Sequence, residues 1–299
     1  MRRLLRKIVN RLAPAKQSKA DDGLMYPLGH FYSPIPSLDE IEKRADTIFN
    51  RDRRTLPGID LNEEKQLELT RQLSAYYPDM PFRFERSDDL RYFFDNPHYC
   101  QSDAVFLYSM LRHFRPKNVV EVGSGFSSAV MLDTNDRFLD RSVNFTFIEP
   151  FADRLRSRLR EGDEASGKVR IIERFVQAVD LEVFESLGEN DFLFIDSTHV
   201  SKVGSDVNHI LFEIMPRIRP GVIVHFHDVF HPFEYPREWI FQGRFWNEDY
   251  MLRAFLSHND AFEILIFNTF LAHFHEAWFA EHMPVCLENT GGALWLRRR

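Results

Sequence analysis

The sequence has 299 residues, of which 44% are hydrophobic and 28% charged, as is typical of a globular protein that folds in water. Its net charge of −7 is unevenly distributed, because residues 1–19 contain seven basic residues and no acidic one. The rest of the chain has 31 basic and 45 acidic residues, an excess that excludes binding to a nucleic-acid backbone as its main function. No apolar run approaches the ~20 residues that a membrane-spanning helix needs.

The cysteines and the N-terminal segment indicate in which cellular compartment the protein is expected. Cys100 and Cys286 are far apart in the sequence and have no partners at metal-site spacing, which favours a reducing, cytoplasmic location. The basic N-terminus has no apolar core or cleavage site of the kind found in signal peptides. Apolar residues between its arginines and lysines could make a weak contact with a membrane surface, and a frayed soluble tail is the alternative reading.

The N-terminal third of the chain has few signals of regular structure. Prolines predict a linker that leads into an extended segment over Tyr26–Pro36. A helix is predicted from Leu38, where Ser37 and Glu40 have the spacing of a capping box. A second helix is predicted over residues 62–76, and residues 79–98 are expected to be irregular.

From about residue 102 the pattern alternates between helix and strand. Helices are predicted over residues 103–113, 127–135, 151–160 and 206–217. Strands are predicted over residues 118–122, 144–148, 169–172, 192–195 and 221–226, followed by a closing pair at 262–267 and 293–296. The strands are apolar runs, which indicates burial on both faces of a sheet. We therefore predict an α/β fold with a doubly wound, mostly parallel Rossmann-like sheet, an antiparallel closing pair and most of the 29 phenylalanines in the core.

A glycine-containing turn follows the first of these strands and precedes a helix. Gly123 and Gly125 allow a tight turn on either side of Ser124 and let a ligand approach the backbone near the free N–H groups of the helix. Glu149 ends the next strand, where an acidic residue of this fold class holds the two hydroxyls of a ribose. This context indicates a nucleotide-like ligand.

The residues around the turn distinguish two cofactors. A dinucleotide-binding motif has a third glycine, which packs the helix closely and seats a pyrophosphate, whereas this sequence has Phe126 and Ser128 in that region. Glu121 places a carboxylate at the strand end, which disfavours phosphate and suits the cationic amino-acid part of S-adenosylmethionine (SAM). The motif therefore favours SAM over NAD.

Polar side chains follow five successive strands of the predicted sheet. In an open parallel sheet the carboxyl ends of the strands lie on one edge, where ligands bind. One site is therefore expected to contain the polar groups at Glu121–Gly125, Glu149, Gln177, Asp196–His199 and His227–Asp228.

The motifs resemble those of a known family. Glu121–Gly125 and Phe147–Pro150 are similar to the first two motifs of class I SAM-dependent methyltransferases. Phe194–His199 and His225–Asp228 resemble a subgroup with metal-dependent macrolide-sugar O-methyltransferases and cephalosporin-hydroxylase-like proteins. The resemblance covers about residues 100–299. It implies a methyltransferase domain over residues 99–299. The charge and helix patterns divide the rest of the chain into a basic tail over residues 1–20 and an extended and helical region over residues 21–98, which the resemblance does not cover.

The resemblance also implies roles for individual residues. In the subgroup the aspartate of an Asp-x-x-His motif is a metal ligand and its histidine a candidate general base, which are Asp196 and His199 here. An acidic pair follows the next strand in the relatives, and here that pair is His227 and Asp228. Histidine in place of a carboxylate shifts the expected metal from Mg²⁺ toward Mn²⁺, Fe²⁺ or Zn²⁺, or leaves no metal. The expected SAM contacts are Glu121, Gly123, Ser124, Gly125, Glu149 and Gln177.

The reaction expected from these features is O-methylation of a hydroxyl on a small-molecule or glycan acceptor, assisted by His199 or by a metal. Two alternatives are an NAD-linked sugar-modifying enzyme and a Rossmann-like binding or scaffold protein without catalysis. The aromatic stretch over residues 231–250 is either a lid on the site or a hydrophobic plug. The sequence is compatible with a homo-oligomer and does not decide the oligomeric state. No nucleic-acid partner is expected.

Overall fold

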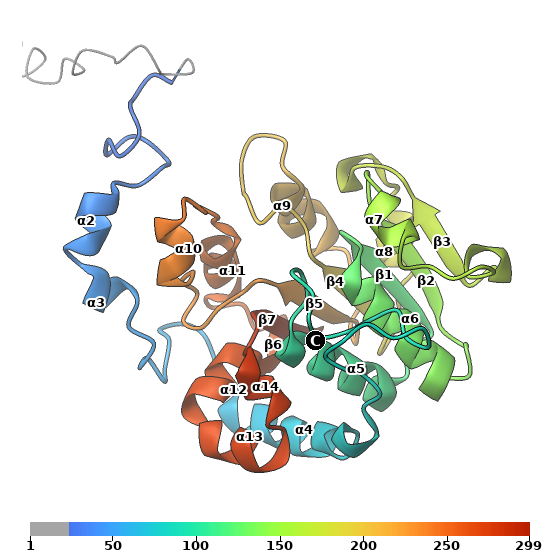
Figure 1. The fold of residues 1–299 in the computed structure, drawn as a ribbon. Coiled ribbons are helices and arrows are strands. Elements are labelled where there is room, and N and C mark those ends of the chain that lie inside the picture. Colours follow the sequence, from blue (N-terminus) through green and yellow to red (C-terminus); the bar gives the residue numbers. More distant parts are fainter. Residues whose placement is uncertain (1–23) are drawn as a thin grey trace, which may run out of the picture. The chain divides into compact units, whose positions relative to one another are not determined.

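A computed structural model describes residues 24–299 of the chain, which form two compact units (Figure 1). The first unit contains residues 24–50 and 236–245 and the second contains residues 51–235 and 246–299. The predicted basic tail over residues 1–20, with its membrane contact, lies outside the described residues. The predicted division into N-terminal region and methyltransferase domain stays a prediction.

The first unit consists of turns and short helices, namely α2 (Leu38–Glu42), α3 (Ala45–Ile48) and α10 (Arg237–Phe241). The predicted N-cap of α2 is confirmed, because the Ser37 hydroxyl accepts a hydrogen bond from the Glu40 backbone N–H. The prediction of an extended segment over Tyr26–Pro36 is wrong. That segment folds back on itself through turns closed by backbone hydrogen bonds such as Gly29 N–H to the Ile35 carbonyl.

The second unit is built on a seven-stranded mixed sheet with the order β3-β2-β1-β4-β5-β7-β6. The strands are β1 (Asn118–Val122), β2 (Asn144–Ile148), β3 (Val169–Ile172), β4 (Phe192–Ile195), β5 (Ile223–His227), β6 (Phe262–Phe267) and β7 (Ala293–Arg298). The first five are parallel, and β7 runs antiparallel between β5 and β6. The predicted α/β fold with its closing pair is confirmed.

Apolar side chains explain why these segments are strands at the centre of the protein. All four residues of β4 and all five of β5 are buried, as expected of strands covered on both faces. Phe192 and Phe194 make edge-to-face contacts with Trp295 of β7, so the core crosses the parallel and antiparallel parts of the sheet. Most of the phenylalanines are buried, as predicted.

Helices cover the sheet in the second unit. They are α4 (Glu63–Ser74), α5 (Gln101–Phe114), α6 (Phe126–Phe138), α7 (Asp153–Arg156), α8 (Glu182–Glu185), α9 (Asp206–His209), α11 (Glu248–Leu256), α12 (Asn268–Phe274), α13 (Glu276–His282) and α14 (Val285–Glu288). Short 3₁₀ segments occur at η1 (Tyr77–Asp79), η2 (Glu164–Ser166) and η3 (Val176–Ala178), and α9 continues into a π-helical turn, η4 (Ile210–Ile214). The long helices α5 and α6 pack side by side against the sheet (Figure 1).

Two predicted helices differ from those in the structure. The helix predicted over residues 151–160 is only the one-turn α7, since Leu155 is its single buried residue and its other three positions hold charged side chains. Too little apolar surface is available there to hold a longer helix on the protein. The helix predicted over residues 206–217 divides into α9 and the π-helical η4.

The irregular segment predicted over residues 79–98 is confirmed from residue 80 onward, since residues 80–100 are neither helix nor strand, whereas Asp79 ends η1. Its anchor is the buried Arg91, whose guanidinium lies 2.8 Å from carboxylate oxygens of Asp133 and Asp136 and 2.9 Å from one of Asp163. Asp133 also accepts hydrogen bonds from the backbone N–H groups of Arg91 and Tyr92. A network of charges therefore fastens this segment to α6.

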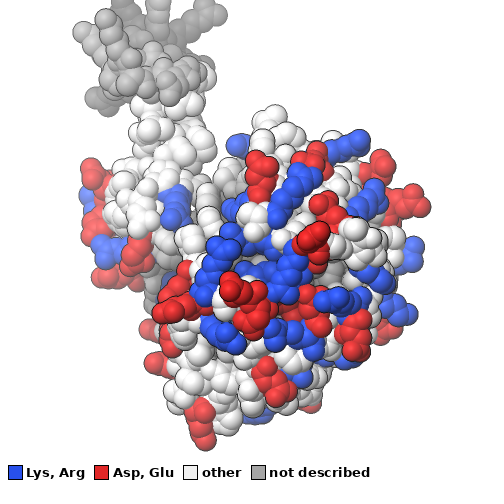
Figure 2. Space-filling model, turned by 45° about the vertical axis from the view of Figure 1, so that its right-hand side comes forward, with Lys and Arg blue, Asp and Glu red and all other residues white. Residues whose placement is uncertain are grey.

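The surface carries charges of both signs. Figure 2 shows Lys and Arg side chains interspersed with Asp and Glu over one face, with basic side chains gathered near its middle. The acidic excess of the sequence therefore does not make this face uniformly negative. None of the helices within residues 24–299 has the length and hydrophobicity required to cross a membrane.

Candidate functional site

The turn after β1 brings the ends of two strands together. Gly123 has a φ of +80°, and a Cβ on it would lie 1.8 Å from the carbonyl oxygen of Asp196, just after β4. Hydrogen bonds from Gly123 N–H to the Ile148 carbonyl and from Asp196 N–H to the Val122 carbonyl, both 2.9 Å, fix this approach. Only glycine fits at position 123, as the predicted tight turn requires.

Glu149 lies directly beside this turn. One of its carboxylate oxygens accepts a hydrogen bond from the Ser124 backbone N–H at 3.2 Å, and the other accepts one from the Phe151 N–H at 2.9 Å. The side chain is half-buried. The structure thus brings together Ser124 and Glu149, which the sequence assigns to the cofactor.

Glu121 is in a different environment from the one the sequence indicates. It is completely buried, and its two carboxylate oxygens accept hydrogen bonds of 2.5 Å from the hydroxyls of Ser127 and Ser128 in the first turn of α6. Burial raises the pKa of Glu121 to about 8, although these hydroxyls partly oppose the shift. Glu121 therefore joins β1 to the start of α6, and its contact with SAM stays a prediction.

Gln177 lies on η3 at the surface, and its side-chain amide donates a hydrogen bond of 2.9 Å to the Gly204 carbonyl. The amide therefore holds the loop that precedes α9. Its predicted cofactor contact stays a prediction.

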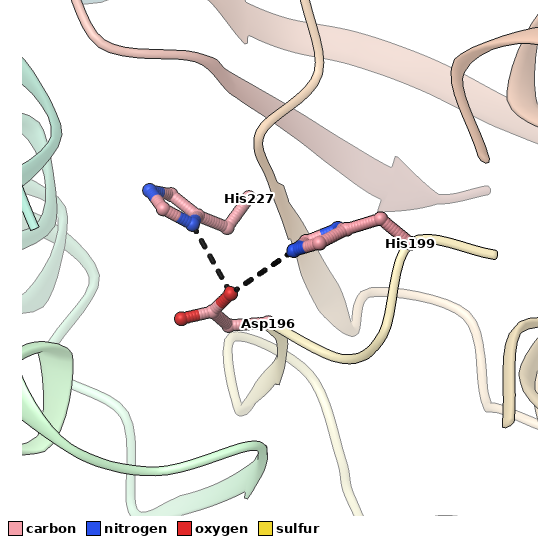
Figure 3. A group of neighbouring side chains, drawn as sticks. All are labelled: Asp196, His199 and His227. Carbon is pink, nitrogen blue, oxygen red and sulfur yellow. Dashed lines mark hydrogen bonds and ion pairs between the residues drawn. The ribbon is translucent and has the colours of Figure 1, made fainter. Parts of the chain in front are cut away.

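Four side chains at the ends of β4 and β5 form what we call the acid–histidine cluster, namely Asp196, His199, His227 and Asp228. Asp196 Oδ1 lies 3.1 Å from His227 Nδ1 and 3.5 Å from His199 Nε2 (Figure 3). Asp228 Oδ2 lies 3.7 Å from His199 Nε2 and 3.8 Å from His227 Nδ1. Potential metal-binding atoms of Asp196, His199 and His227 all lie within 4.8 Å of one another.

The register of the sheet explains why these residues meet. Ile195 of β4 pairs with Phe226 of β5, so the next residues, Asp196 and His227, lie beside each other at the strand ends. His199 and Asp228 have left-handed backbone conformations, with φ of +59° and +55°. Such conformations are uncommon for residues other than glycine, although aspartate and histidine adopt them more often than most.

Two further carboxylates contact the cluster from outside. Glu248 Oε2, at the start of α11, lies 2.9 Å from His199 Nδ1, and Asp103 Oδ2, in the first turn of α5, lies 3.3 Å from His227 Nε2. Both residues are almost completely buried.

Neither outer carboxylate is among the predicted site residues. A signal for Asp103 exists, because it is an acid within a helical segment whose neighbours are apolar. Glu248 follows an irregular stretch and has no such signal in the sequence.

The neighbouring carboxylates raise the pKa of both histidines more than burial lowers it. Burial lowers the pKa of His199, but hydrogen bonds to Asp196 and Glu248 outweigh burial and raise this pKa to about 10. Burial is likewise outweighed at His227, where Asp228 and Asp196 raise the pKa well above its usual range. Burial would raise the pKa of Asp196, but the two imidazoles hold it well below its usual range.

Aromatic rings surround the cluster. The Trp246 ring lies 4.5 Å from the His199 ring and the Tyr99 ring 5.1 Å from the His227 ring, measured between centroids. The His225 ring stacks on Phe194 and lies tilted against Trp295, and burial keeps its pKa well below the usual value. It is therefore a neutral core residue.

Comparisons with known proteins agree with this description of the fold. A family model described as a methyltransferase domain matches residues 120–229, which contain the turn after β1 and the acid–histidine cluster. An uncharacterized protein of Archaeoglobus fulgidus is 36% identical over 174 residues, or 56% of this chain and 76% of that protein.

Among solved structures, the chain is similar to the SAH-bound methyltransferase PaMTH1 of Podospora anserina, with 16% identity, coverage of 89% of this chain and 99% of that one, and a TM-score of 0.41. It is also similar to the O-methyltransferase TomG of Streptomyces achromogenes in complex with SAM, with 16% identity, coverage of 76% and 96%, and a TM-score of 0.44. The methyltransferase-domain match runs from β1 to the end of β5, the parallel part of the sheet. The chain therefore contains a methyltransferase domain, which the family model matches over residues 120–229.

Proposed function

We propose that the protein transfers the methyl group of SAM to the oxygen of a hydroxyl on a small-molecule or glycan acceptor. The observation that carries this proposal is the contact between Gly123 and the backbone of Asp196. It places a cofactor-type turn directly against a cluster of acidic and basic side chains. Methyl donor and proton acceptor would therefore be neighbours.

The residues around the turn fit SAM. Gly123 and Gly125 leave their backbone bare where a side chain would clash, which gives a ligand close access. The half-buried carboxylate of Glu149 is at the end of β2, where it would hold the ribose hydroxyls. When bound, SAM supplies a methyl group on a positively charged sulfur that an oxygen can attack.

The acid–histidine cluster fits the activation of a hydroxyl. A hydroxyl keeps its proton at neutral pH and attacks poorly unless a neighbouring group removes or weakens that proton. His199 remains our proposed base, a role that requires its Nε2, which faces Asp196 and Asp228, first to give up the proton that the neighbouring carboxylates favour. The same donor set also fits a divalent ion, which lowers the pKa of a hydroxyl bound to it. Trp246 beside His199 suits the apolar face of a sugar or flat acceptor.

The test is calorimetric binding of SAM, S-adenosylhomocysteine and NAD to the full chain and to Glu149→Ala. We expect SAM to bind and the variant to bind it about 10- to 100-fold more weakly, because hydrogen bonds to a charged group are lost. Glu173→Ala is the matched control, since Glu173 follows β3 as Glu149 follows β2 but pairs with Arg156. Transfer of label from methyl-labelled SAM to hydroxyl rather than amine acceptors completes the test.

Other results would contradict the proposal. Binding of NAD without SAM would indicate an NAD-linked enzyme. A folded chain that binds neither would indicate a binding or scaffold protein, and methylation of amines alone would reject the hydroxyl acceptor.

A further inference from the structure

We propose that Arg154 and Arg158 bind an anionic group, a carboxylate or a phosphate, on the molecule that accepts the methyl group. Both side chains lie beside the turn after β1, where the proposed function places the cofactor. The inference rests on that function and deepens it, because it names the chemical class of the acceptor. The anionic group is separate from the hydroxyl, which reacts at the acid–histidine cluster.

The side chain of Arg154 lies across the second glycine of the turn. A Cβ on Gly125 would lie 2.9 Å from Arg154 Nε and 3.5 Å from its Cδ and Cζ atoms. A side chain at position 125 would therefore displace the guanidinium. The φ of Gly125 is 172°, outside the left-handed region, so the glycine here leaves room for the arginine.

Arg158 lies against the residue that follows Gly125. Its guanidinium carbon is 4.9 Å from the centre of the ring of Phe126, the first residue of α6. Its Nε donates a hydrogen bond of 3.2 Å to the Ser157 hydroxyl. Stacking on an aromatic ring fixes the plane of a guanidinium and leaves the N–H groups at its edge available to an anion.

The protein does not neutralise either arginine. In the described part of the chain no carboxylate forms an ion pair with Arg154 or Arg158, whereas Arg156 between them pairs with Glu173. Glu149, beside the turn, accepts hydrogen bonds from two backbone N–H groups instead. The first turn of α6 contains no acidic residue to balance the partial positive charge of its N-terminus. An anion would balance the positive charge of this place.

The arginines lie within about the length of a small molecule from the acid–histidine cluster. The Cα atoms of Gly123 and Gly125 are at most about 7 Å apart, because only one residue separates them. Gly123 meets the backbone of Asp196, and Gly125 meets the side chain of Arg154. An acceptor whose anionic group is several bonds away from its hydroxyl would therefore reach both places at once.

The charges of SAM favour the acceptor over the cofactor as the source of the anion. SAM has one carboxylate and two cationic groups, its ammonium and its sulfonium, so it cannot neutralise two arginines. An anionic acceptor supplies the missing negative charge and can form two parallel hydrogen bonds with a guanidinium. The positive potential beside the turn would also attract such an acceptor from solution.

The first test measures binding of inorganic phosphate to the full chain saturated with S-adenosylhomocysteine, by calorimetry at constant ionic strength. We expect one equivalent of phosphate to bind. Arg154→Gln and Arg158→Gln should each weaken phosphate binding about 10- to 100-fold, because a hydrogen bond between charged groups is lost. Arg156→Gln is the matched control, since Arg156 pairs with Glu173 and its replacement should leave phosphate affinity unchanged.

A second test distinguishes the acceptor from the cofactor. SAM and decarboxylated SAM are titrated into the wild type and Arg154→Gln, and we expect the substitution to change each affinity less than about 3-fold. A loss of affinity for SAM alone would show that Arg154 binds the carboxylate of the cofactor, which would overturn the inference.

The acceptors themselves give a third test. Among hydroxyl compounds that take label from methyl-labelled SAM, anionic ones should have a kcat/KM at least about 10-fold higher than their neutral analogues. Arg154→Gln should abolish this preference mainly through KM, because the arginine binds a part of the acceptor that does not react.

Three further results would overturn the inference, namely a folded wild-type chain that binds no phosphate, phosphate binding that both substitutions leave intact, or a preference for neutral acceptors. The first is read on the wild type and does not depend on how the variants fold. SAM binding to the wild type separates the two proposals. A chain that binds SAM but no phosphate retains the proposed function alone, and a chain that binds no SAM loses both.

Discussion

Gly123 combines a φ of +80° with a near contact to the carbonyl oxygen of Asp196, so two separate physical effects oppose any side chain there. We predict that Gly123→Ala lowers the free energy of unfolding by about 1–2 kcal/mol through the left-handed backbone. The clash adds about 1–3 kcal/mol, because the alanine Cβ forces β1 and β4 apart. Urea denaturation of the two proteins measures the sum.

Gly204→Ala is the matched control for this prediction. Gly204 has a φ of +72°, but no atom lies within 4 Å of the position of its Cβ. Gly204→Ala should therefore lower the free energy of unfolding only by the amount due to the left-handed backbone, without the additional loss from a steric clash. Equal losses in the two variants would contradict the close approach of β1 and β4.

Residue patterns predicted part of the site and missed the rest for a physical reason. Asp196 directly follows β4 and His227 is the last residue of β5, so the geometry of a parallel sheet alone brings them to one edge. Asp103 and Glu248 reach the cluster through tertiary packing of helices that are far away in the sequence. No local pattern encodes such a contact, although a buried acid in an apolar helix is a signal that it exists.

The irregular segment over residues 80–100 depends on one buried cation for its attachment to α6. We predict that Arg91→Met lowers the free energy of unfolding by about 3–5 kcal/mol, because it leaves the buried Asp133 carboxylate without its charge partner. Arg83→Met is the control, since the pair between Arg83 and Asp89 is exposed and should contribute only about 0–1 kcal/mol. Guanidinium denaturation curves of both variants give the comparison. A loss at Arg91 no larger than at Arg83 would show that the network does not fasten the segment.

Strands were easier to predict than helices in this chain. Each strand is a short apolar run with turn residues on both sides, and burial on two faces leaves little ambiguity in such a run. The helix over residues 151–160 is predicted too long because its apolar and charged residues follow an amphipathic pattern beyond α7. The structure shows that only Leu155 is buried there, and burial decides the length.

The stability of the whole protein should depend on pH through Glu121. Its pKa is about 8 in the folded protein and has the ordinary value of 4.5 when exposed. Between these values the folded state binds more protons than the unfolded state. The stabilisation is therefore complete below pH 4.5 and is lost as the pH rises through about 8.

Glu121→Gln removes this titration. We predict that the variant loses less free energy of unfolding than the wild type between about pH 5 and pH 8, by up to a few kcal/mol. Glu182→Gln on α8 is the control, because Glu182 is exposed and its replacement should leave the pH profile unchanged. Parallel profiles for wild type and Glu121→Gln would show that the carboxyl is ionised in the folded protein.

The division into two compact units could not be predicted from the sequence. Residues 236–245 group with residues 24–50, nearly 200 positions away, through contacts such as the pair of Arg237 with Glu42 at 2.8 Å. Alternation of helix and strand describes neighbours along the chain and contains no information about such a grouping. Whether the stretch over residues 231–250 acts as a lid stays a prediction.

The position of β7 between β5 and β6 has a consequence for biosynthesis. The strand that completes the hydrogen bonds of β5 is made 66 residues after β5 ends, which takes about 3–13 s at a ribosome that adds about 5–20 residues per second. During that interval the nascent chain exposes the edge of a strand that is completely buried in the folded protein and ends at the acid–histidine cluster. An exposed strand edge can pair with a strand of another chain and so start aggregation. We therefore expect cotranslational chaperones to be needed most while residues 228–292 are being made.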